Sequence, residues 1–531
     1  MNCKATNLSY QQTGYFSRII TDYLQNDASL RSFYAHPVSL EGVKSAIYAR
    51  DQFKTNRKIL VEELTKQYHN LELSVAVRDN IEKLSLENTY TITTAHQPAI
   101  FTGTLFFVYK ILHTIKIAKY LSAELPEKNF VPVYYMGSED ADLDELGYIY
   151  LDNEKISWEA KQNGAVGRMK TKGLEKIIDR IEGEFSVQPY GKELAALLRD
   201  CYLKSPDIQT ATFKLIDKLF AEYGLIVLIP DNPNFKNLMK PVFEDDLINQ
   251  TASSIVEKTI RSFPENYKVQ ANPREINLFY LKDNIRELIE FKNEKFIVRH
   301  TEIQFTKDEI LAELKNSPER FSPNVILRGL FQSTILPDIA FIGGGGETAY
   351  WLELKDLFGH YSVPFPILIL RNSFLIIEKR WEEKITNAGL MVTDIFKPAE
   401  TLLSEIVKNE SKNQVSLQKE ITVAEDYYSN LKMIAGNIDI TLQQHVEAMR
   451  VKALKQLKEL EKKLLRNEKR KFEDIHRQIH QIKSSLFPLN NLQERIENFM
   501  PYYAKWGKAF IDLVYQNSLT LEQEFTVIEE K

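Results

Sequence analysis

The segment 93–103, Thr-Thr-Ala-His-Gln-Pro-Ala-Ile-Phe-Thr-Gly, follows a predicted strand and could bind an anion. We expect Thr102 and Gly103 to open the next helix, where free N–H groups and the helix dipole favour negative charge. His96 could stabilise a phosphoryl oxygen or act as an acid or base, and Gln97 could contact substrate. The alternative is that Thr102 only caps the helix and His96 is an ordinary loop residue.

A dense acidic cluster follows the next predicted strand and places five carboxylates within residues 137–145. Such a cluster can bind a substrate amine, a sugar hydroxyl or Mg²⁺. We predict that Glu139 and Asp140, nearest the strand end, deprotonate an amine, while Asp142 and Asp144 bind substrate. If the segment is helical, Asp140 and Asp144 share one face. The alternative is an acidic first turn that only stabilises a helix through its dipole.

Four consecutive glycines lie between a predicted strand and a predicted helix. A loop without Cβ atoms can wrap closely around a ligand, and Glu347 at the helix start could bind an amine or cap the backbone. The pattern is neither the Rossmann Gly-x-Gly-x-x-Gly fingerprint nor a P-loop. The alternative is a flexible turn without a ligand. The predicted substrate-binding residues here are Gly343, Gly344, Gly345, Gly346, Glu347 and Tyr350.

Arg328 and Gln332 are four residues apart and share one face if their segment is helical. Arg328 could clamp a substrate carboxylate or phosphate through two parallel hydrogen bonds. A structural salt bridge is the equally weighted alternative.

Composition places these residues in an ordinary globular protein. The chain has 531 residues, of which 44% are hydrophobic and 27% charged, and this length corresponds to about three to four domains. Lys and Arg total 68 against 73 Asp and Glu, a net charge of −5. This near balance gives no global attraction to nucleic acid or to an anionic membrane, and we expect neither as a partner.

Two cysteines, Cys3 and Cys201, exclude a disulfide framework and a multi-cysteine zinc or iron–sulfur site. We expect no metal site. The chain shows no secretory signal and no apolar run long enough to span a bilayer, so we expect a soluble cytoplasmic protein.

Near-continuous apolar runs of strand length indicate a sheet that is covered on both faces. Helical patterns, most clearly Leu105–Leu121, lie between these runs. Alternating strands and helices predict an α/β fold with a parallel sheet, so that loops following the strands meet at one edge. The predicted strands are Thr89–Thr94, Val131–Met136, Leu225–Ile229, Ile339–Ile342 and Pro366–Leu370.

The region Pro398–Leu486 has the apolar spacing of a coiled coil, with a slip near Glu468. A break at Gly436-Asn437 would let two helices fold back on each other as an antiparallel arm, which ends before Pro488. Because an apolar seam of this length needs a partner, we expect a homodimer through this arm.

Six stretches in order resemble the bacillithiol-biosynthesis cysteine-adding enzymes, the BshC family, and run from about residue 96 to 499. They are HQPAIFTGTLFFVYKILHTIKIAK, VPVYYMGSEDADLDEL, GLIVLIPDNPNFKNLMKPVFE, NLFYLKDNIR, PERFSPNVILRGLFQSTILPDIAFIGGGGETAYW and LFPLNNLQERIENF. The resemblance implies a Rossmann-like core, connecting insertions and a coiled-coil dimerisation domain.

With that resemblance we divide the chain into seven segments. They are 1–150 and 223–240 as parts of the core, 151–222 and 241–322 as connecting insertions, 323–397 as the glycine-rich part of the core, 398–486 as the arm, and 487–531 as C-terminal helices packing back on the core.

The resemblance also implies the reaction, a ligation of L-cysteine to the amine of glucosaminyl-malate. A free carboxylate does not form an amide readily in water, so we expect activation by ATP, through an acyl-adenylate or an acyl-phosphate. The alternatives are another carboxylate–amine ligase or a nucleotidylyl transferase on the same scaffold, or a non-catalytic coiled-coil scaffold. We predict a nucleotide site near the junction of arm and core, formed by Leu489, Asn491, Gln493, Arg495 and Trp506. The alternative is an ordinary salt bridge at a domain junction.

Overall fold

The central element is a five-stranded parallel sheet in the order β13-β12-β2-β3-β6. The structure is a computed structural model that describes residues 3–411 and 416–531; Met1, Asn2 and residues 412–415, the last within the predicted arm, lie outside the described residues. The sheet consists of β2 (Thr89–His96), β3 (Asn129–Met136), β6 (Ile226–Leu228), β12 (Asp338–Gly343) and β13 (Ile367–Leu370).

The predicted parallel sheet and α/β fold class are therefore confirmed, with strand ends shifted by a few residues. Almost every residue of these strands is buried, as expected for a sheet covered on both faces. The strand order reverses between β2 and β12. At such a switch point the carboxyl ends of the strands open a crevice for ligands.

Several helices pack on this sheet. The predicted helix is α6 (Phe106–Glu124), which lies against β2 and β3, and α3 (Leu40–Asp51) lies against β12 and β13. The remaining helices of the body are α1 (Tyr10–Thr13), α2 (Arg18–Leu24), α4 (Arg57–Tyr68), α5 (Val75–Lys83), α7 (Leu143–Leu146), α8 (Leu174–Phe185), α9 (Gly191–Leu198), α10 (Ile208–Phe220), α11 (Pro233–Asn237), α12 (Lys240–Ile248), α13 (Thr251–Ser262), α14 (Lys307–Asn316), α15 (Val325–Ile335), α16 (Gly345–Trp351), α17 (Lys355–His360), α18 (Lys379–Asn387), α23 (Met500–Trp506) and α24 (Lys508–Asn517).

The described residues form three further sheets, whose strands the sequence patterns did not predict. An antiparallel sheet in the order β10-β9-β8-β7-β11 is built from β7 (Leu278–Lys282), β8 (Ile285–Lys292), β9 (Lys295–Val298), β10 (Gln304–Phe305) and β11 (Phe321–Pro323). A second sheet pairs β1 (Cys3–Ser9) with β15 (Glu524–Glu530) and β15 with β14 (Ser373–Ile377). The third is a hairpin of β4 (Tyr148–Leu151) and β5 (Glu154–Ser157).

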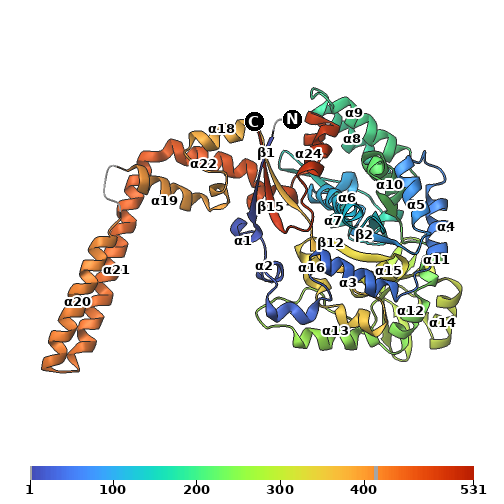
Figure 1. The fold of residues 1–531 in the computed structure, drawn as a ribbon, viewed down its shortest axis with the longest axis horizontal. Helices are drawn as coiled ribbons and strands as arrows, with labels where there is room; N and C mark the ends of the chain where they lie inside the picture. Colours follow the sequence, from blue (N-terminus) through green and yellow to red (C-terminus); the bar gives the residue numbers. More distant parts are fainter. Residues whose placement is uncertain (1–2, 412–415) are drawn as a thin grey trace.

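A long helical hairpin projects from the body (Figure 1). It consists of α20 (Gln418–Ile438) and α21 (Leu442–Lys469), which pack against each other, so the predicted coiled-coil arm is confirmed. At its base, α19 (Ala399–Glu410) packs on α21 and on α22 (Glu473–Leu486). The predicted slip near Glu468 coincides with the end of α21 and a short 3-10 turn at Arg470–Phe472.

The predicted helix break at Gly436-Asn437 is wrong, because α20 continues to Ile438. The turn follows at Asp439, whose carboxylate accepts a hydrogen bond from the N–H of Thr441 at 2.8 Å. A Cβ on Gly436 would lie 2.0 Å from Nε2 of Gln443. The glycine therefore permits close contact between the two helices rather than ending one. None of the helices in the described residues combines the length and apolar character that a membrane span requires.

Candidate active site

A cavity of about 350 Å³ lies at the carboxyl edge of the central sheet. Residues from all four segments singled out in the sequence line it, which agrees with the expected convergence at this edge. These segments contribute His96 and Gln97; Glu139, Asp140 and Glu145; Glu347 and Tyr350; and Asn324 and Arg328. Phe106, Tyr135 and Arg286 complete much of the wall.

His96 ends β2 and packs its ring against Phe106 and Phe107, with centroid separations of 5.4 and 5.1 Å. Burial, together with the nearby Lys110 cation, lowers the pKa of His96 to about 3. Its imidazole is therefore neutral at physiological pH. A neutral ring can exchange hydrogen bonds with substrate, a phosphoryl oxygen included, but it adds no positive charge.

The expected helix start at Thr102 and Gly103 is wrong. Both residues have positive φ angles, of 71° and 64°, and α6 begins only at Phe106. The Thr102 side chain caps nothing and is buried, and neither residue lines the cavity. The turn of the chain at Phe101–Gly103 separates the end of β2 from α6. Thr102 and Gly103 therefore do not form a helix start at the cavity.

Glu139 is almost fully buried and forms an ion pair with the buried Lys236, with 2.5 Å between Oε1 and Nζ. Lys236 also donates to the carbonyl of Phe321 at 2.7 Å. Asp140 is more open: its Oδ2 accepts from Nε2 of Gln97 at 3.1 Å. Of the two predicted bases, Asp140 is thus the carboxylate with room for a substrate amine, whereas Glu139 is occupied by Lys236.

Asp142 and Asp144 do not line the cavity. Helix α7 begins at Leu143, so the expected common helical face of Asp140 and Asp144 does not exist. Asp142 is the N-cap of α7 and accepts from the N–H of Glu145 at 3.1 Å. Asp144 is exposed in the first turn. These two residues therefore match the alternative given above, an acidic first turn that stabilises the start of a helix.

The four glycines do not form a loop. Gly343 ends β12, Gly344 is the N-cap of α16, and Gly345 and Gly346 begin that helix. None of the four has a positive φ or lines the cavity. Glu347 caps the helix by accepting from the N–H of Gly344 at 2.8 Å. The glycine run therefore forms an abrupt strand-to-helix turn, which brings Glu347 to the cavity wall.

Lys110 is a residue that the sequence reasoning missed. It lies on α6, is fully buried, and donates from Nζ to the carbonyl of Ala95 at 2.5 Å and to Oε2 of Glu347 at 2.6 Å. Burial alone would raise the pKa of Glu347, but the Lys110 cation and the Gly344 N–H lower it. A lysine within the otherwise apolar run LFFVYKIL was the signal available in the sequence.

Arg328 and Gln332 lie on one face of α15, as predicted, and Nη1 of Arg328 donates to Oε1 of Gln332 at 3.2 Å. Nη2 of Arg328 donates to the hydroxyl of Tyr350 at 2.6 Å. Gln332 is buried, binds Asp338 at 2.8 Å and does not line the cavity. Arg328 thus faces the cavity with no hydrogen bond to a carboxylate of the described residues, and Gln332 orients it.

Arg286 was also missed, because it comes from β8 in the second insertion. Its Nη1 lies 3.8 Å from Oδ1 of Asp140, and its guanidinium lies 4.0 Å from the ring centroid of Phe279. Burial lowers the pKa of Arg286, while the carboxylates of Asp140 and Glu139 oppose that shift. The antiparallel sheet therefore supplies a cation to the wall of a cavity that the central sheet forms.

The predicted nucleotide residues are not brought together around one cavity. A second cavity of about 450 Å³ lies where α18 and α22 meet the body, and of the five residues it is lined by Gln493 alone. Gln493 exchanges hydrogen bonds with the backbone of Ile376, at 2.9 and 3.2 Å. Leu489 and Arg495 are exposed; Asn491 accepts from its neighbour Leu492, and Trp506 packs partly buried against the core.

The first cavity combines cations and carboxylates on different walls. Arg286 and Arg328 can bind a carboxylate or phosphate, and Asp140 can bind an ammonium group and accept its proton. In the described part of the chain, no group of three metal-ligating side chains is found at this cavity. The arrangement suits a reaction in which an anionic substrate presents an amine as the nucleophile.

Comparisons with known proteins give a family for the whole chain. Residues 1–372 match the profile of the bacillithiol biosynthesis BshC N-terminal Rossmann-like domain, and residues 374–530 match that of the BshC C-terminal coiled-coil domain. A protein of Flavobacterium johnsoniae named "Putative cysteine ligase BshC" is 40% identical over 98% of this chain and 99% of its own length. Proteins with the same name from Flavobacterium psychrophilum and Bacillus cytotoxicus are 38% and 26% identical, over 98% and 96% of this chain and 99% and 98% of their own lengths.

Proposed function

Because the chain belongs to the BshC family of bacillithiol biosynthesis, we propose that it is a ligase that joins L-cysteine to the amine of glucosaminyl-malate. Relatives that match almost the full chain carry the name of a cysteine ligase, which supports the proposal. The product is an amide, formed between the cysteine carboxylate and the sugar amine.

The observation that carries this proposal is the charge arrangement of the cavity at the sheet edge. The malyl group of the substrate carries two carboxylates, and Arg328 and Arg286 are the cations on the cavity wall. Arg328 is held by Gln332 and Tyr350, so its guanidinium is oriented before substrate binds. A bidentate contact from such an arginine would fix the malyl end.

Asp140 is the group that we assign to the amine. At neutral pH the amine of the sugar is largely cationic, and it must lose a proton before its nitrogen can attack. Asp140 attracts the ammonium group, accepts its proton and leaves a neutral nucleophile. The nitrogen then attacks the activated carbonyl carbon of cysteine, and the activating group leaves with the electron pair of the broken C–O bond.

Carboxylate activation by ATP is part of the proposal, since water does not permit ready amide formation from a free acid. The cavity at the arm junction is lined by Arg380 and Trp381, groups that suit phosphate and adenine, while Lys505 in the same wall is paired with Glu378 and Glu530. Titration of ATP into the protein should give weaker binding for Arg380→Ala, and the same titration with Arg495→Ala tests the residue predicted from sequence. Wild-type affinity in both variants would refute a nucleotide site at this junction.

The direct test is to incubate the purified protein with L-cysteine, glucosaminyl-malate and ATP, and to detect the product and the nucleotide by mass spectrometry. We expect the amide product and one cleaved ATP per product. Reactions lacking one component identify which substrates are needed. Absence of product with every combination would refute the ligase, whereas product without nucleotide cleavage would refute only the ATP step.

A further inference from the structure

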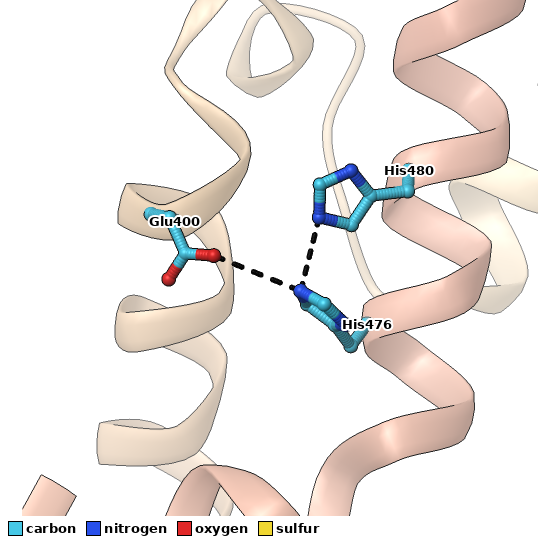
Figure 2. A group of neighbouring side chains, drawn as sticks. All are labelled: Glu400, His476 and His480. Carbon is cyan, nitrogen blue, oxygen red and sulfur yellow. Dashed lines mark hydrogen bonds and ion pairs between the residues drawn. The ribbon is translucent and has the colours of Figure 1, made fainter. Parts of the chain in front are cut away.

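Three side chains with metal-binding atoms meet at the base of the arm, away from both cavities described above. Glu400 comes from α19, and His476 and His480 come from α22 (Figure 2). Figure 2 shows the three side chains pointing toward one another across the space between the two helices. One oxygen of Glu400 and one ring nitrogen of each histidine all lie within 4.8 Å of one another.

The separations of these atoms fit a small metal ion. Nε2 of His476 lies 2.9 Å from Nε2 of His480 and 3.6 Å from Oε1 of Glu400. With zinc–nitrogen bonds of about 2.0–2.1 Å, the ligand atoms of a tetrahedral site are about 3.3 Å apart. We propose that Glu400, His476 and His480 bind a divalent transition-metal ion of the Zn²⁺ class.

Local structure holds the three ligands in place. Histidines four residues apart on a helix lie on the same face, one turn from each other. Ile479, between them in sequence, is buried in a cluster with Leu402 and Leu403 of α19, which fixes one helix against the other. The ligand set of two imidazoles and one carboxylate suits Zn²⁺, Co²⁺, Ni²⁺ or Cu²⁺ rather than Mg²⁺ or Ca²⁺, which prefer oxygen ligands alone.

Neighbouring charges limit how Glu400 can bind a metal. Lys469 donates from Nζ to Oε2 of Glu400 at 2.8 Å, so Glu400 offers only Oε1. Lys469 comes from the end of α21, and Arg477, which follows His476 on α22, pairs with Asp474. Three protein ligands leave a fourth position for water, and the exposure of Glu400 and His480 gives an ion access from solvent. A bound ion would link α19 to α22, and so fix the base of the arm.

Metal binding is tested on the full-length protein after removal of metals with a chelator. Zn²⁺ is titrated in competition with a chromophoric chelator, and we expect one ion per chain with micromolar or tighter affinity. Co²⁺ should give the visible absorption of a tetrahedral site. A wild-type protein that takes up no Zn²⁺ in this competition would overturn the proposal.

Substitutions of the proposed ligands test where the metal ion binds. Glu400→Gln and His480→Gln should each weaken Zn²⁺ binding by at least about tenfold, with unchanged circular dichroism. The matched control is His445→Gln, which removes an exposed histidine of α21 and should leave the affinity unchanged. Added Zn²⁺ should raise the unfolding midpoint of the wild type and the control but not of the two ligand variants. Equal affinities in all four proteins would show adventitious binding elsewhere and refute the assignment.

Discussion

At the scale of single residues, the ion pair between Lys110 and Glu347 connects the carboxyl ends of β2 and β12, the two paired strands at the switch point. Lys110 binds the carbonyl at the end of β2, and Glu347 binds the N–H that opens α16 after β12. The lysine is buried, so its ammonium group has lost its hydration and depends on these two acceptors. The edge of the cavity is thereby fixed before any substrate binds.

This dependence predicts the effect of Glu347→Gln. Removing one partner of a buried ion pair leaves an uncompensated charge and should lower the free energy of unfolding by about 3–5 kcal/mol. The double variant Lys110→Met/Glu347→Gln should lose less than the sum of the two single variants. Urea denaturation of the four proteins measures this coupling, and additive losses would contradict it.

A second prediction at this scale concerns Asp140. If its carboxylate takes the proton of the amine, Asp140→Asn should reduce product formation by about 10²–10⁴-fold with unchanged secondary structure. The matched control is Asp308→Asn, at an exposed position in the first turn of α14. Near-normal turnover in both Asp140→Asn and Glu139→Gln would assign the proton transfer to another group, such as Glu347 or His96.

At the scale of elements, the turn between β12 and α16 depends on its glycines to different degrees. A Cβ on Gly343 would lie 2.9 Å from Cε1 of Phe341 and 3.2 Å from Cβ of Glu347. Phe341 cannot easily move, because it is buried and stacked on Trp351 at a centroid distance of 4.5 Å. A Cβ on Gly346 would meet nothing within 4 Å.

We therefore predict that substitution by alanine has opposite effects on the free energy of unfolding at Gly343 and Gly346. Gly343→Ala should lower the free energy of unfolding by about 1–3 kcal/mol through overpacking. Gly346→Ala should raise it by about 0.5–1 kcal/mol, because alanine favours a helix over glycine. Chemical denaturation compares the two, and a destabilised Gly346→Ala would show that this position has a role beyond the turn.

His113 connects α6 to two loop residues, Asn372 and Thr520, and its burial predicts a pH dependence of stability. Its Nδ1 accepts from the N–H of Asn372 at 3.1 Å, and Nε2 lies 3.1 Å from the carbonyl of Thr520. Burial lowers the pKa of His113 to about 4. In the unfolded chain the pKa of a histidine is about 6.5, so the unfolded state binds the proton first as the pH falls. The contribution of His113 to the free energy of unfolding is therefore complete above about pH 6.5 and is lost as the pH falls toward about 4.

The expected loss from this residue between pH 7 and pH 5 is about 2 kcal/mol of unfolding free energy. In His113→Gln the stability should be lower at pH 7 but fall less steeply toward pH 5. His69→Gln, at an exposed histidine, should keep the wild-type slope. Urea denaturation at the two pH values measures the slopes, and identical slopes in all three proteins would contradict the assignment.

Sequence patterns predicted those elements whose apolar residues form an uninterrupted signal. Most of the central strands are of this kind, because both faces of the sheet are covered. Strand β2 contains four threonines and was recognised by its β-branched and aromatic residues, and α6 was recognised by apolar residues at helical spacing. Strand β8 is mostly half-buried or exposed, and β9 alternates between buried and less buried residues over only 4 positions, so neither gave a comparable signal. Of the site residues, sequence reasoning found those that directly follow a central strand and also Arg328, through its four-residue spacing from Gln332. Arg286 and Lys236 contact site residues from distant segments of the chain, and Lys110 contacts one from inside a helix.

At the scale of the whole molecule, the arm presents apolar residues that nothing in the described chain covers. The exposed large apolar side chains on α20 and α21 include Val423, Tyr427, Met433, Ile434, Met449 and Val451. A coiled-coil hairpin of this kind gains stability when a second copy covers such a face. We therefore keep the prediction of a homodimer through the arm.

The structure suggests a deletion that tests the predicted homodimer. The N–H of Leu417 lies 2.9 Å from a carboxylate oxygen of Glu461, so the two ends of the segment 418–460 lie side by side. Replacing that segment by a short Gly-Ser linker should give a folded monomer by light scattering, where the full chain gives a dimer. A full-length monomer, or a dimer that persists after the deletion, would contradict the prediction.

The pairing of β1 with β15 sets the order in which the chain can fold during its synthesis. Cys3 lies opposite Glu530 and Ser9 opposite Glu524, so β1 leaves the ribosome long before its partner is made. At about 5–20 residues per second, this interval is roughly 25–100 s. The strands of the central sheet are complete by Leu370 and can pair during that time, while β1 remains an unpaired edge. The sheet that joins the two ends of the chain therefore forms after the central sheet, and its formation completes the body.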